Sequence, residues 1–215
     1  MLVSNNNPMF DEIILPSWLV PFLKPRFHRL ALCAKRYSMV SRKRMQNLWR
    51  LIHHLERHHV KGTFVEMGVA RGGTALLLAS LARQSNPPRK VWLCDAFEES
   101  SPPEFHYADV ERLLFETMRF DPSQVRLVKG WFDQVLPGYP QDPISFLHID
   151  AGGYAPVKCC LDFLLPFLEK GGYVVLDNYG VDEGCRQAVL EALHLPGRNW
   201  PLLRFGRTQA YFQSS

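Results

Sequence analysis

The sequence predicts an α/β fold: a mostly parallel, seven-stranded sheet with helices on both faces. The first observation is that short apolar runs alternate with longer helical patterns from residue 63 onward, which favours a parallel sheet covered on both sides. The second is that several of these runs end in acidic residues beside glycines. The third is the length of 215 residues, which can bury one substantial core.

The first 61 residues are expected to form an N-terminal arm and helix that serve as a lid or packing segment. Four prolines punctuate the first 30 residues, so we expect this segment to be a loosely held arm with short helical pieces around residues 18–23. Ser41 is a good N-cap, and the apolar period that follows predicts a helix ending before Gly62.

Residues 62–215 are expected to form the second unit, a single α/β domain. Its expected strands span 63–67, 91–95, 125–128, 145–150 and 172–177, and its expected helices span about 73–84, 107–118, 156–168 and 183–193. Two further segments, 202–205 and 208–212, are joined through Gly206 and Arg207 and predict a closing antiparallel hairpin.

Charge is distributed unevenly between these two units. Residues 1–61 carry a net charge of +8 and the remainder −4. A basic arm can hold nucleic acid, an anionic lipid surface or an anionic substrate. It can equally be the solvated face of packed helices, and the helical spacing of Leu48, Trp49 and Ile52 among the charges favours this second interpretation.

The compartment is expected to be the cytoplasm. The five cysteines are odd in number and show no CxxC spacing, which indicates reduced thiols. The N-terminus lacks the features of a secretory leader, and no apolar run approaches the ~20 residues that span a bilayer. We therefore expect no membrane contact.

A glycine-containing loop, residues 66–74, follows the first strand and opens an apolar helix. Because it is not GxGxxG, a dinucleotide is disfavoured. A carboxylate at Glu66 would repel a phosphate but suits the cationic amino end of S-adenosylmethionine. Asp95, at the end of the second strand, is placed for the ribose hydroxyls; the alternative for both acids is a cap or loop role. The loop residues expected to contact this cofactor are Glu66, Gly68, Arg71, Gly72 and Thr74.

A metal site is expected at the ends of two neighbouring strands. Asp150, Asp177 and Asn178 offer three oxygen ligands, which suit Mg²⁺ with positions left for water and substrate. Such an ion would lower the pKa of a substrate hydroxyl before it attacks a methyl group. The alternative is that Asp177 and Asn178 only cap the following turn.

Residues 37–213 resemble the macrocin/mycinamicin sugar O-methyltransferase family, which are metal-dependent class I methyltransferases of natural-product pathways. The matching stretches are residues 37–41, 64–73, 95–97, 130–132 with 136–137, 148–150 with Tyr154, and 171–180. Each motif is modest, but their order and spacing match over four-fifths of the chain.

The resemblance implies methylation of a hydroxyl on a small molecule, a sugar or polyketide-like specialised metabolite, with S-adenosylmethionine and Mg²⁺. It also implies that the arm completes the acceptor pocket or a contact within a homodimer. Further cofactor contacts follow from the same matched stretches, at Tyr37, Met39, Ala96, Phe97, Trp131 and Phe132.

The chain departs from the family pattern at the metal site and the lid. Gly152 and Asn178 stand where the family usually has carboxylates, although Asp/Asp-Asn is similar to the metal triad of catechol-type enzymes. The lysine base of those enzymes is replaced by Gly153, and the lid segment after Asp95 is short.

The general base is therefore open. His106 lies in the expected lid and could accept the hydroxyl proton near neutral pH, with an ordinary surface histidine as the alternative. Asp150 is the other catalytic candidate. His148 shares a strand face with Asp150 and is expected to be buried and hydrogen-bonded.

Two other classes of function are considered. A nucleic-acid methyltransferase would use the basic arm, but the Asn/Asp-Pro-Pro-aromatic tetrapeptide of base methylation is absent after the fourth strand. The stretch 86–89, Asn-Pro-Pro-Arg, precedes the second strand and is expected to be a linker. The second of these classes is a non-catalytic protein of the same fold that binds the cofactor or a partner.

Overall fold

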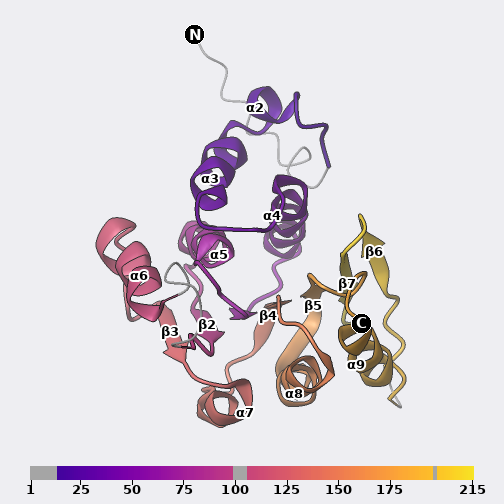
Figure 1. Cartoon of the computed structure of the whole chain (residues 1–215). Helices are drawn as coiled ribbons and strands as arrows, with labels where there is room; N and C mark the ends of the chain where they lie inside the picture. Colours follow the sequence, from indigo (N-terminus) through magenta and orange to yellow (C-terminus); the bar gives the residue numbers. More distant parts are fainter. Residues whose placement is uncertain (1–13, 99–105, 196–197) are drawn as a thin grey trace.

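A seven-stranded sheet forms the centre of the protein. The computed structural model describes residues 14–98, 106–195 and 198–215, and its strands lie in the order β3-β2-β1-β4-β5-β7-β6 (Figure 1). The five parallel strands are β1 (Thr63–Met67), β2 (Val91–Asp95), β3 (Val125–Lys129), β4 (Ile144–Ile149) and β5 (Leu168–Leu176). β7 (Gln209–Gln213) pairs antiparallel with β5 and with β6 (Leu203–Phe205). The predicted sheet and closing hairpin are confirmed.

Helices cover both faces of the sheet because successive strand residues point to opposite sides. Phe64 belongs to one buried cluster and Val65 to the other. The first cluster packs beneath α3 (Pro25–Lys35), α4 (Arg42–Arg57), α5 (Gly73–Gln84) and α6 (Tyr107–Glu111). The second packs beneath α7 (Phe132–Val135), α8 (Tyr154–Leu164) and α9 (Glu183–Leu193).

Helix α4 begins where the sequence predicts it. The Ser41 hydroxyl accepts a hydrogen bond from the Arg44 backbone N–H at 3.3 Å, which satisfies one of the unpaired amides at the helix start. The apolar side of the helix, including Leu48 and Trp49, is buried against α3, α5 and the sheet. The helix ends at Arg57, several residues before Gly62.

The arm is more ordered than its prolines suggest. Besides α2 (Val20–Leu23), the structure has an eleven-residue helix, α3, over residues that were expected to be loosely held. Pro25 occupies the first turn of α3, where no N–H is needed, so it starts the helix instead of breaking it. Ala31 and Ala34 are fully buried, because their small side chains allow α3 to pack closely on α5. Residues 1–13 lie outside the described part.

Smaller differences concern element boundaries. α6 continues as a π-helical turn over Arg112–Thr117, α8 ends at Leu164, and β5 begins at Leu168, before the expected start. The four-residue helix α7 was not expected. Within the described ranges, no helix is both long and apolar enough to cross a bilayer.

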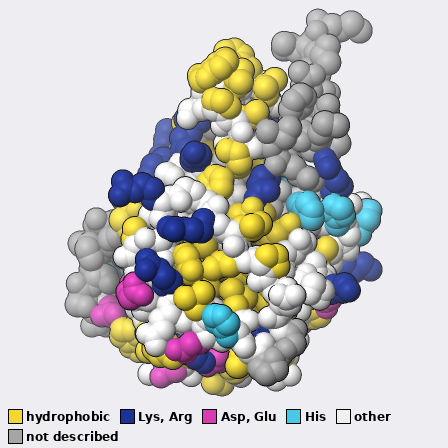
Figure 2. Space-filling view, turned by 90° about the vertical axis from the view of Figure 1, so that its right-hand side faces the viewer, with side chains coloured by type: hydrophobic (Ala, Val, Ile, Leu, Met, Phe, Trp, Pro, Cys, Tyr) yellow, Lys and Arg dark blue, Asp and Glu magenta, His cyan; other side chains and the backbone are white. Residues whose placement is uncertain are grey.

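The surface around α2 is apolar and the neighbouring surface is basic. Figure 2 shows hydrophobic side chains gathered at the α2 end of the molecule, with Lys and Arg side chains spread below them. Trp18 and Phe22 are 70% and 75% exposed.

Candidate active site

The glycine loop lies directly against the end of β4. Gly68 has a φ of +97°, and a Cβ at this position would come 2.6 Å from the Asp150 carbonyl oxygen. The close approach is held by hydrogen bonds on both sides, from Gly68 N to Cys94 O and from Asp150 N to Met67 O. Glycine is therefore required here, because it lets the cofactor loop and the Asp150 strand end share one edge of the sheet.

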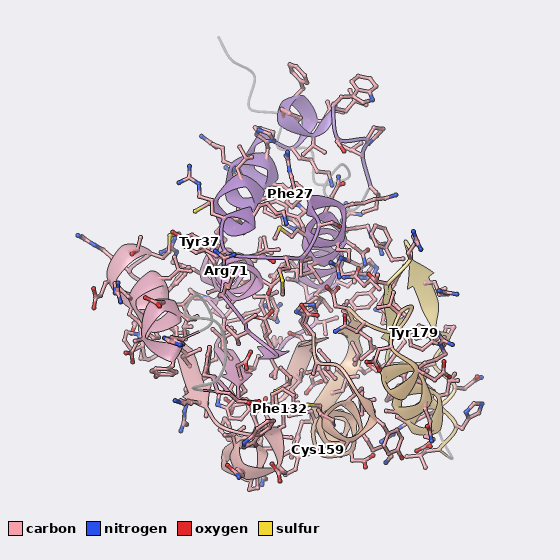
Figure 3. The ribbon with its side chains drawn as sticks, in the orientation of Figure 1. Phe27, Tyr37, Arg71, Phe132, Cys159 and Tyr179 are labelled. Carbon is pink, nitrogen blue, oxygen red and sulfur yellow. The ribbon has the colours of Figure 1, made fainter. Side chains whose placement is uncertain are left out.

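The segment before α4 packs on the same loop. Gly72 has a φ of +85° and caps α5, and the Gly73 N–H donates to Tyr37 O at 3.0 Å. A Cβ on residue 73 would lie 2.4 Å from the Ser38 Cβ, so only glycine admits this contact. Figure 3 shows Tyr37 and Arg71 near each other, close to the start of α5.

A small hollow separates this segment from the loop and reaches Asp150. Its volume is about 20 Å³, enough for roughly one water molecule. A hollow of about 370 Å³ adjoins it, and Tyr37 and Arg71 line both. The residues that line the small hollow are Tyr37, Ser38, Met39, Val40, Val69, Ala70, Arg71, Thr74 and Asp150.

Asp95 holds the glycine loop in shape. Its Oδ2 accepts hydrogen bonds from the backbone N–H groups of Val69 and Ala70, each at 2.7 Å. Its Oδ1 accepts from Phe97 N at 3.2 Å. This is the loop role that the sequence offered as the alternative for Asp95; the expected contact with ribose hydroxyls stays a prediction and would have to share these oxygens.

A second hollow, of about 340 Å³, lies near the ends of β2 and β3. It is lined by Phe97, His106, Tyr107, Ala108 and Lys129. His106 is thus exposed in a different hollow from Asp150. The segment 99–105, which contains most of the expected lid, lies outside the described residues. Of the other expected cofactor residues, Ala96 is half-buried, Trp131 is 52% exposed, and Phe132 packs against the second core cluster.

Glu66 and His148 form a buried pair beneath this edge. Glu66 Oε1 lies 2.9 Å from His148 Nδ1, and both side chains are fully buried. Burial lowers the pKa of His148, but Asp177 and Glu66 on either side raise it more, to about 10. His148 is therefore an imidazolium at neutral pH, and its buried, hydrogen-bonded state agrees with the expectation. Glu66 Oε2 is buried with no hydrogen-bond partner among the described residues, which leaves it able to accept from a ligand's ammonium group.

Asp150, Asp177 and Asn178 are brought together at the strand ends. Asn178 Nδ2 donates to Asp150 Oδ1 at 3.1 Å and to Ala151 O at 3.3 Å. Burial and the nearby Asp177 carboxylate raise the pKa of Asp150 to about 6, although Arg44 and His148 oppose them. Asp150 is thus a carboxylate at neutral pH and a stronger base than an ordinary aspartate.

Asp177 is fully buried and makes two close contacts with cationic or amide donors. Its Oδ2 lies 2.6 Å from Arg44 Nη1, and its Oδ1 accepts from Gln209 Nε2 at 2.5 Å. Burial raises the pKa of Asp177, but His148, Arg44 and Gln209 lower it more, so the carboxylate stays ionised.

The three expected metal ligands do not fit Mg²⁺ in this arrangement. Mg²⁺ needs oxygen lone pairs converging at ~2.0–2.1 Å. Both Asp177 oxygens instead face N–H donors, and Asn178 directs its N–H₂ group at Asp150. Among residues 14–98, 106–195 and 198–215, no group of three or more His, Cys, Asp or Glu side chains could hold a metal ion.

The sequence did not single out three residues that contact one another or Asp177 at this edge: Arg44, Gln209 and Asn47. Asn47 Nδ2 donates to Gln209 Oε1 at 2.6 Å, so the Asp177 contacts are fixed by a polar chain from α4 through β7. A signal was present, because Asn47 interrupts the apolar side of α4 and is fully buried. Buried amides of this kind need partners, but the sequence does not say which.

The fold and this loop define a class I methyltransferase that uses S-adenosylmethionine. The fold is similar to the solved structure of the O-methyltransferase NovP, at 27% identity and a TM-score of 0.75, covering 83% of this chain and 82% of that one. The family model described as Macrocin-O-methyltransferase (TylF) matches residues 30–214, so the chain belongs to this family of O-methyltransferases.

Curated relatives act on natural products. One, from Streptomyces olivaceus, is 8-demethyl-8-(2,3-dimethoxy-alpha-L-rhamnosyl)-tetracenomycin-C 4'-O-methyltransferase, 32% identical over 71% of this chain and 66% of its own length. Another, demethyldecarbamoylnovobiocin O-methyltransferase from Streptomyces niveus, is 29% identical over 74% and 68%. Mycinamicin III 3''-O-methyltransferase from Micromonospora griseorubida is 25% identical over 83% and 79%. The chain thus spans about two thirds of the length of the first two.

Proposed function

We propose that this protein transfers the methyl group of S-adenosylmethionine to a hydroxyl on the sugar of a specialised metabolite. The observation that carries the proposal is the position of Asp150, which lines the same hollow as Arg71 and Thr74 of the glycine loop. A base at this point stands between a cofactor on the loop and an acceptor at the strand ends. The sugar is proposed because one relative is named as the 4'-O-methyltransferase of a tetracenomycin that carries a dimethoxy-rhamnosyl group.

Asp150 is proposed as the general base. Its carboxylate would accept the hydroxyl proton as the oxygen attacks the methyl carbon, and its raised pKa suits this task near neutral pH. His106 is the second candidate for the general base. We rank it after Asp150 because it lines a different hollow from the one that Asp150 and the glycine loop share. Mg²⁺ assistance, expected from sequence, is left out of the proposed reaction because the donor set does not fit it.

The direct test is product formation. Purified protein is incubated with S-adenosylmethionine and a panel of rhamnosyl and other deoxyhexosyl natural products, and S-adenosylhomocysteine and methylated product are measured together. We expect stoichiometric formation of both with at least one glycoside and none with the matching aglycone. Cofactor binding without transfer to any member of a broad glycoside and aglycone panel would favour the non-catalytic alternative.

Cofactor binding should weaken when Asp95 is replaced by alanine. The change removes an ionic acceptor for two loop amides and for any ribose hydroxyl, so binding of S-adenosylmethionine should lose about 1.5–3 kcal/mol. Titration calorimetry measures it, with Asp121→Ala, at the opposite end of β3, as the control. Unchanged affinity in Asp95→Ala would remove this residue from the cofactor site.

The basic arm should not hold RNA at physiological salt. Several of its cations already have partners inside the protein: Arg42 with His28, Arg44 with Asp177, and Arg50 with Asn47. Any remaining attraction to phosphates is non-specific and falls steeply with salt. Filter binding with single-stranded and duplex RNA checks this, and sequence-selective binding at physiological salt would support the nucleic-acid alternative.

A further inference from the structure

The starting point is the donor set at the expected metal position. Asp177 is fully buried, and both of its oxygens accept from side chains, Oδ2 from Arg44 and Oδ1 from Gln209. Gln209 cannot turn away freely, because its own carbonyl accepts from the buried Asn47 amide. A divalent cation would have to displace a guanidinium and break this chain of contacts.

The remaining groups offer too few oxygens. Gly152 has no side chain to offer. The N–H₂ group of Asn178 donates hydrogen bonds to Asp150 Oδ1 and Ala151 O. In a Mg²⁺ site, Asp150 and Asn178 would both direct oxygens toward the ion, whereas here the two side chains are hydrogen-bonded to each other. Asp150 Oδ2 is then the one carboxylate oxygen of the three expected ligands that accepts no hydrogen bond from another of them or from Arg44 or Gln209, so Asp177 and Asn178 do not add to the ligand set in this arrangement.

Arg44 supplies a fixed positive charge at the same place. Its side chain is 22% exposed, so it is largely shielded from solvent but not fully buried. Of its five N–H donors, only one on Nη1 is hydrogen-bonded to a described residue, which leaves donors for a ligand oxygen. Guanidinium groups stay protonated at all relevant pH values and suit this task in partly buried sites.

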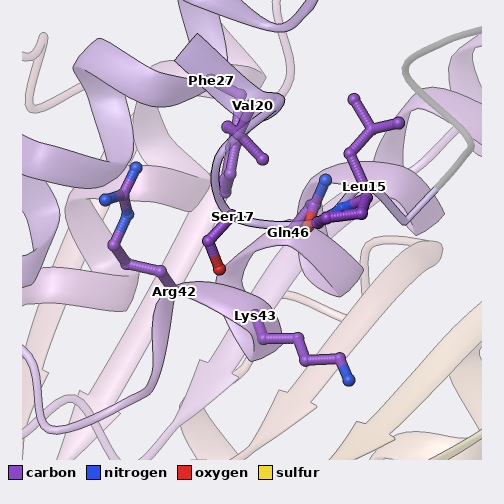
Figure 4. A pocket seen from close by; sticks show the side chains of 8 residues that line it. Leu15, Ser17, Val20, Phe27, Arg42, Lys43 and Gln46 are labelled. Carbon is purple, nitrogen blue, oxygen red and sulfur yellow. The ribbon is translucent and has the colours of Figure 1, made fainter.

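Arg44 and the two basic residues before it in α4, Arg42 and Lys43, face different parts of the protein. Arg42 and Lys43 line a different hollow, of about 140 Å³, with Leu15, Val20 and Phe27 of the arm and its helices (Figure 4). Arg44, the next residue of the helix, points instead to Asp177 at the end of β5. Adjacent positions of one helix therefore provide matched variants with and without the Asp177 contact.

We propose that the Arg44 guanidinium, fixed by Asp177, is the cation beside the acceptor oxygen in this enzyme, and that the site takes no divalent metal. The inference rests on the proposed methyl transfer. The acceptor oxygen forms a bond to the methyl carbon, the C–S bond breaks with its electron pair passing to sulfur, and the hydroxyl proton passes to Asp150. Arg44 donates hydrogen bonds to the oxygen while negative charge develops on it.

The first experiment measures metal binding and needs no acceptor. Mn²⁺ binding is followed by electron paramagnetic resonance, and thermal unfolding is recorded with EDTA and with millimolar Mg²⁺ or Mn²⁺. We expect no Mn²⁺ binding and an unchanged Tm for the wild-type protein. Arg44→Met combined with Asn178→Asp frees Asp177 and restores a second carboxylate, so it should gain Mn²⁺ binding and a Tm that rises with Mn²⁺. Lys43→Met with Asn178→Asp keeps the guanidinium and should gain neither.

Stoichiometric Mn²⁺ binding by the wild-type protein that is lost in Asp177→Asn would overturn the inference. If the Arg44→Met double variant does not fold, the wild-type measurement alone still decides the point. Once an acceptor that the protein methylates has been found, EDTA should leave the rate of methyl transfer unchanged. Arg44→Met should lower kcat about 10²–10³-fold, which is the usual effect of removing one oxyanion donor. Failure to find any acceptor would count against the proposed function, whereas Mn²⁺ binding would count against this inference.

Discussion

Replacing Asp150 by asparagine is expected to lower kcat for methyl transfer about 10²–10⁴-fold, the usual contribution of a positioned general base. The substitution keeps an oxygen that can accept from Asn178 Nδ2, so the local hydrogen bond survives. Affinity for S-adenosylmethionine should change little, because the loop is held by Asp95 and backbone contacts instead. Steady-state kinetics and calorimetry on the same preparation separate the two effects.

The control for this prediction is Asp142→Asn. Asp142 pairs with Lys90 near the opposite end of the sheet and should be neutral for turnover. Wild-type turnover in Asp150→Asn would move the base elsewhere, and His106→Gln, also measured, would then show the large loss. With Asp150 as the base, His106→Gln should have a small effect.

Replacing His148 by leucine is expected to cost about 3–5 kcal/mol of folding free energy, the range for removing one partner of a buried ion pair. The change leaves Glu66 and Asp177 buried without the imidazolium that lies between them. Urea unfolding measures the loss. His148→Gln, which can still donate a hydrogen bond to Glu66, should lose less than His148→Leu. A loss below about 1 kcal/mol in the leucine variant, typical of surface sites, would contradict the buried charge arrangement.

The buried His148 imidazolium also predicts how the stability loss of His148→Leu depends on pH. The folded pKa of His148 is raised to about 10, above the ~6.5 of an unfolded histidine. Its contribution to stability is therefore complete below about pH 6.5 and is lost as the pH rises toward 10. The deficit of His148→Leu should accordingly shrink over this window. Asp177, with a lowered pKa, acts in the opposite sense and loses its contribution as the solution becomes strongly acidic.

The strands were predictable because buried parallel strands read as continuous apolar runs between turn residues. The helix α3 was not, since Pro25 marks a helix start as readily as a break, and only the packing of Ala31 and Ala34 decides between them. Short α7 has too few residues for a helical period to appear.

The candidate site was predictable in position but not in its pairings. Strand-end acids meet at one edge by topology, which the sequence order alone implies. Which groups they contact depends on residues far apart in the chain: Arg44 and Asp177 are separated by 133 positions, and Glu66 and His148 by 82. Arg44 therefore looked like one more cation on a charged helix face, and Asp177 like a metal ligand.

The chain of contacts through Gln209 sets an order of events during synthesis. Asn47 lies 162 positions before Gln209, and Gln209 lies on β7, which follows the other six strands of this sheet in the chain. A nascent chain that has reached Asn178 already contains Arg44, Asp150 and Asp177, yet it lacks the amide that fixes one oxygen of Asp177. The parallel strands can assemble at that stage, but the catalytic edge acquires its final geometry only when β7 adds to β5. The proposed methyl transfer would therefore depend on the closing hairpin, although no residue of β6 or β7 was expected at the site.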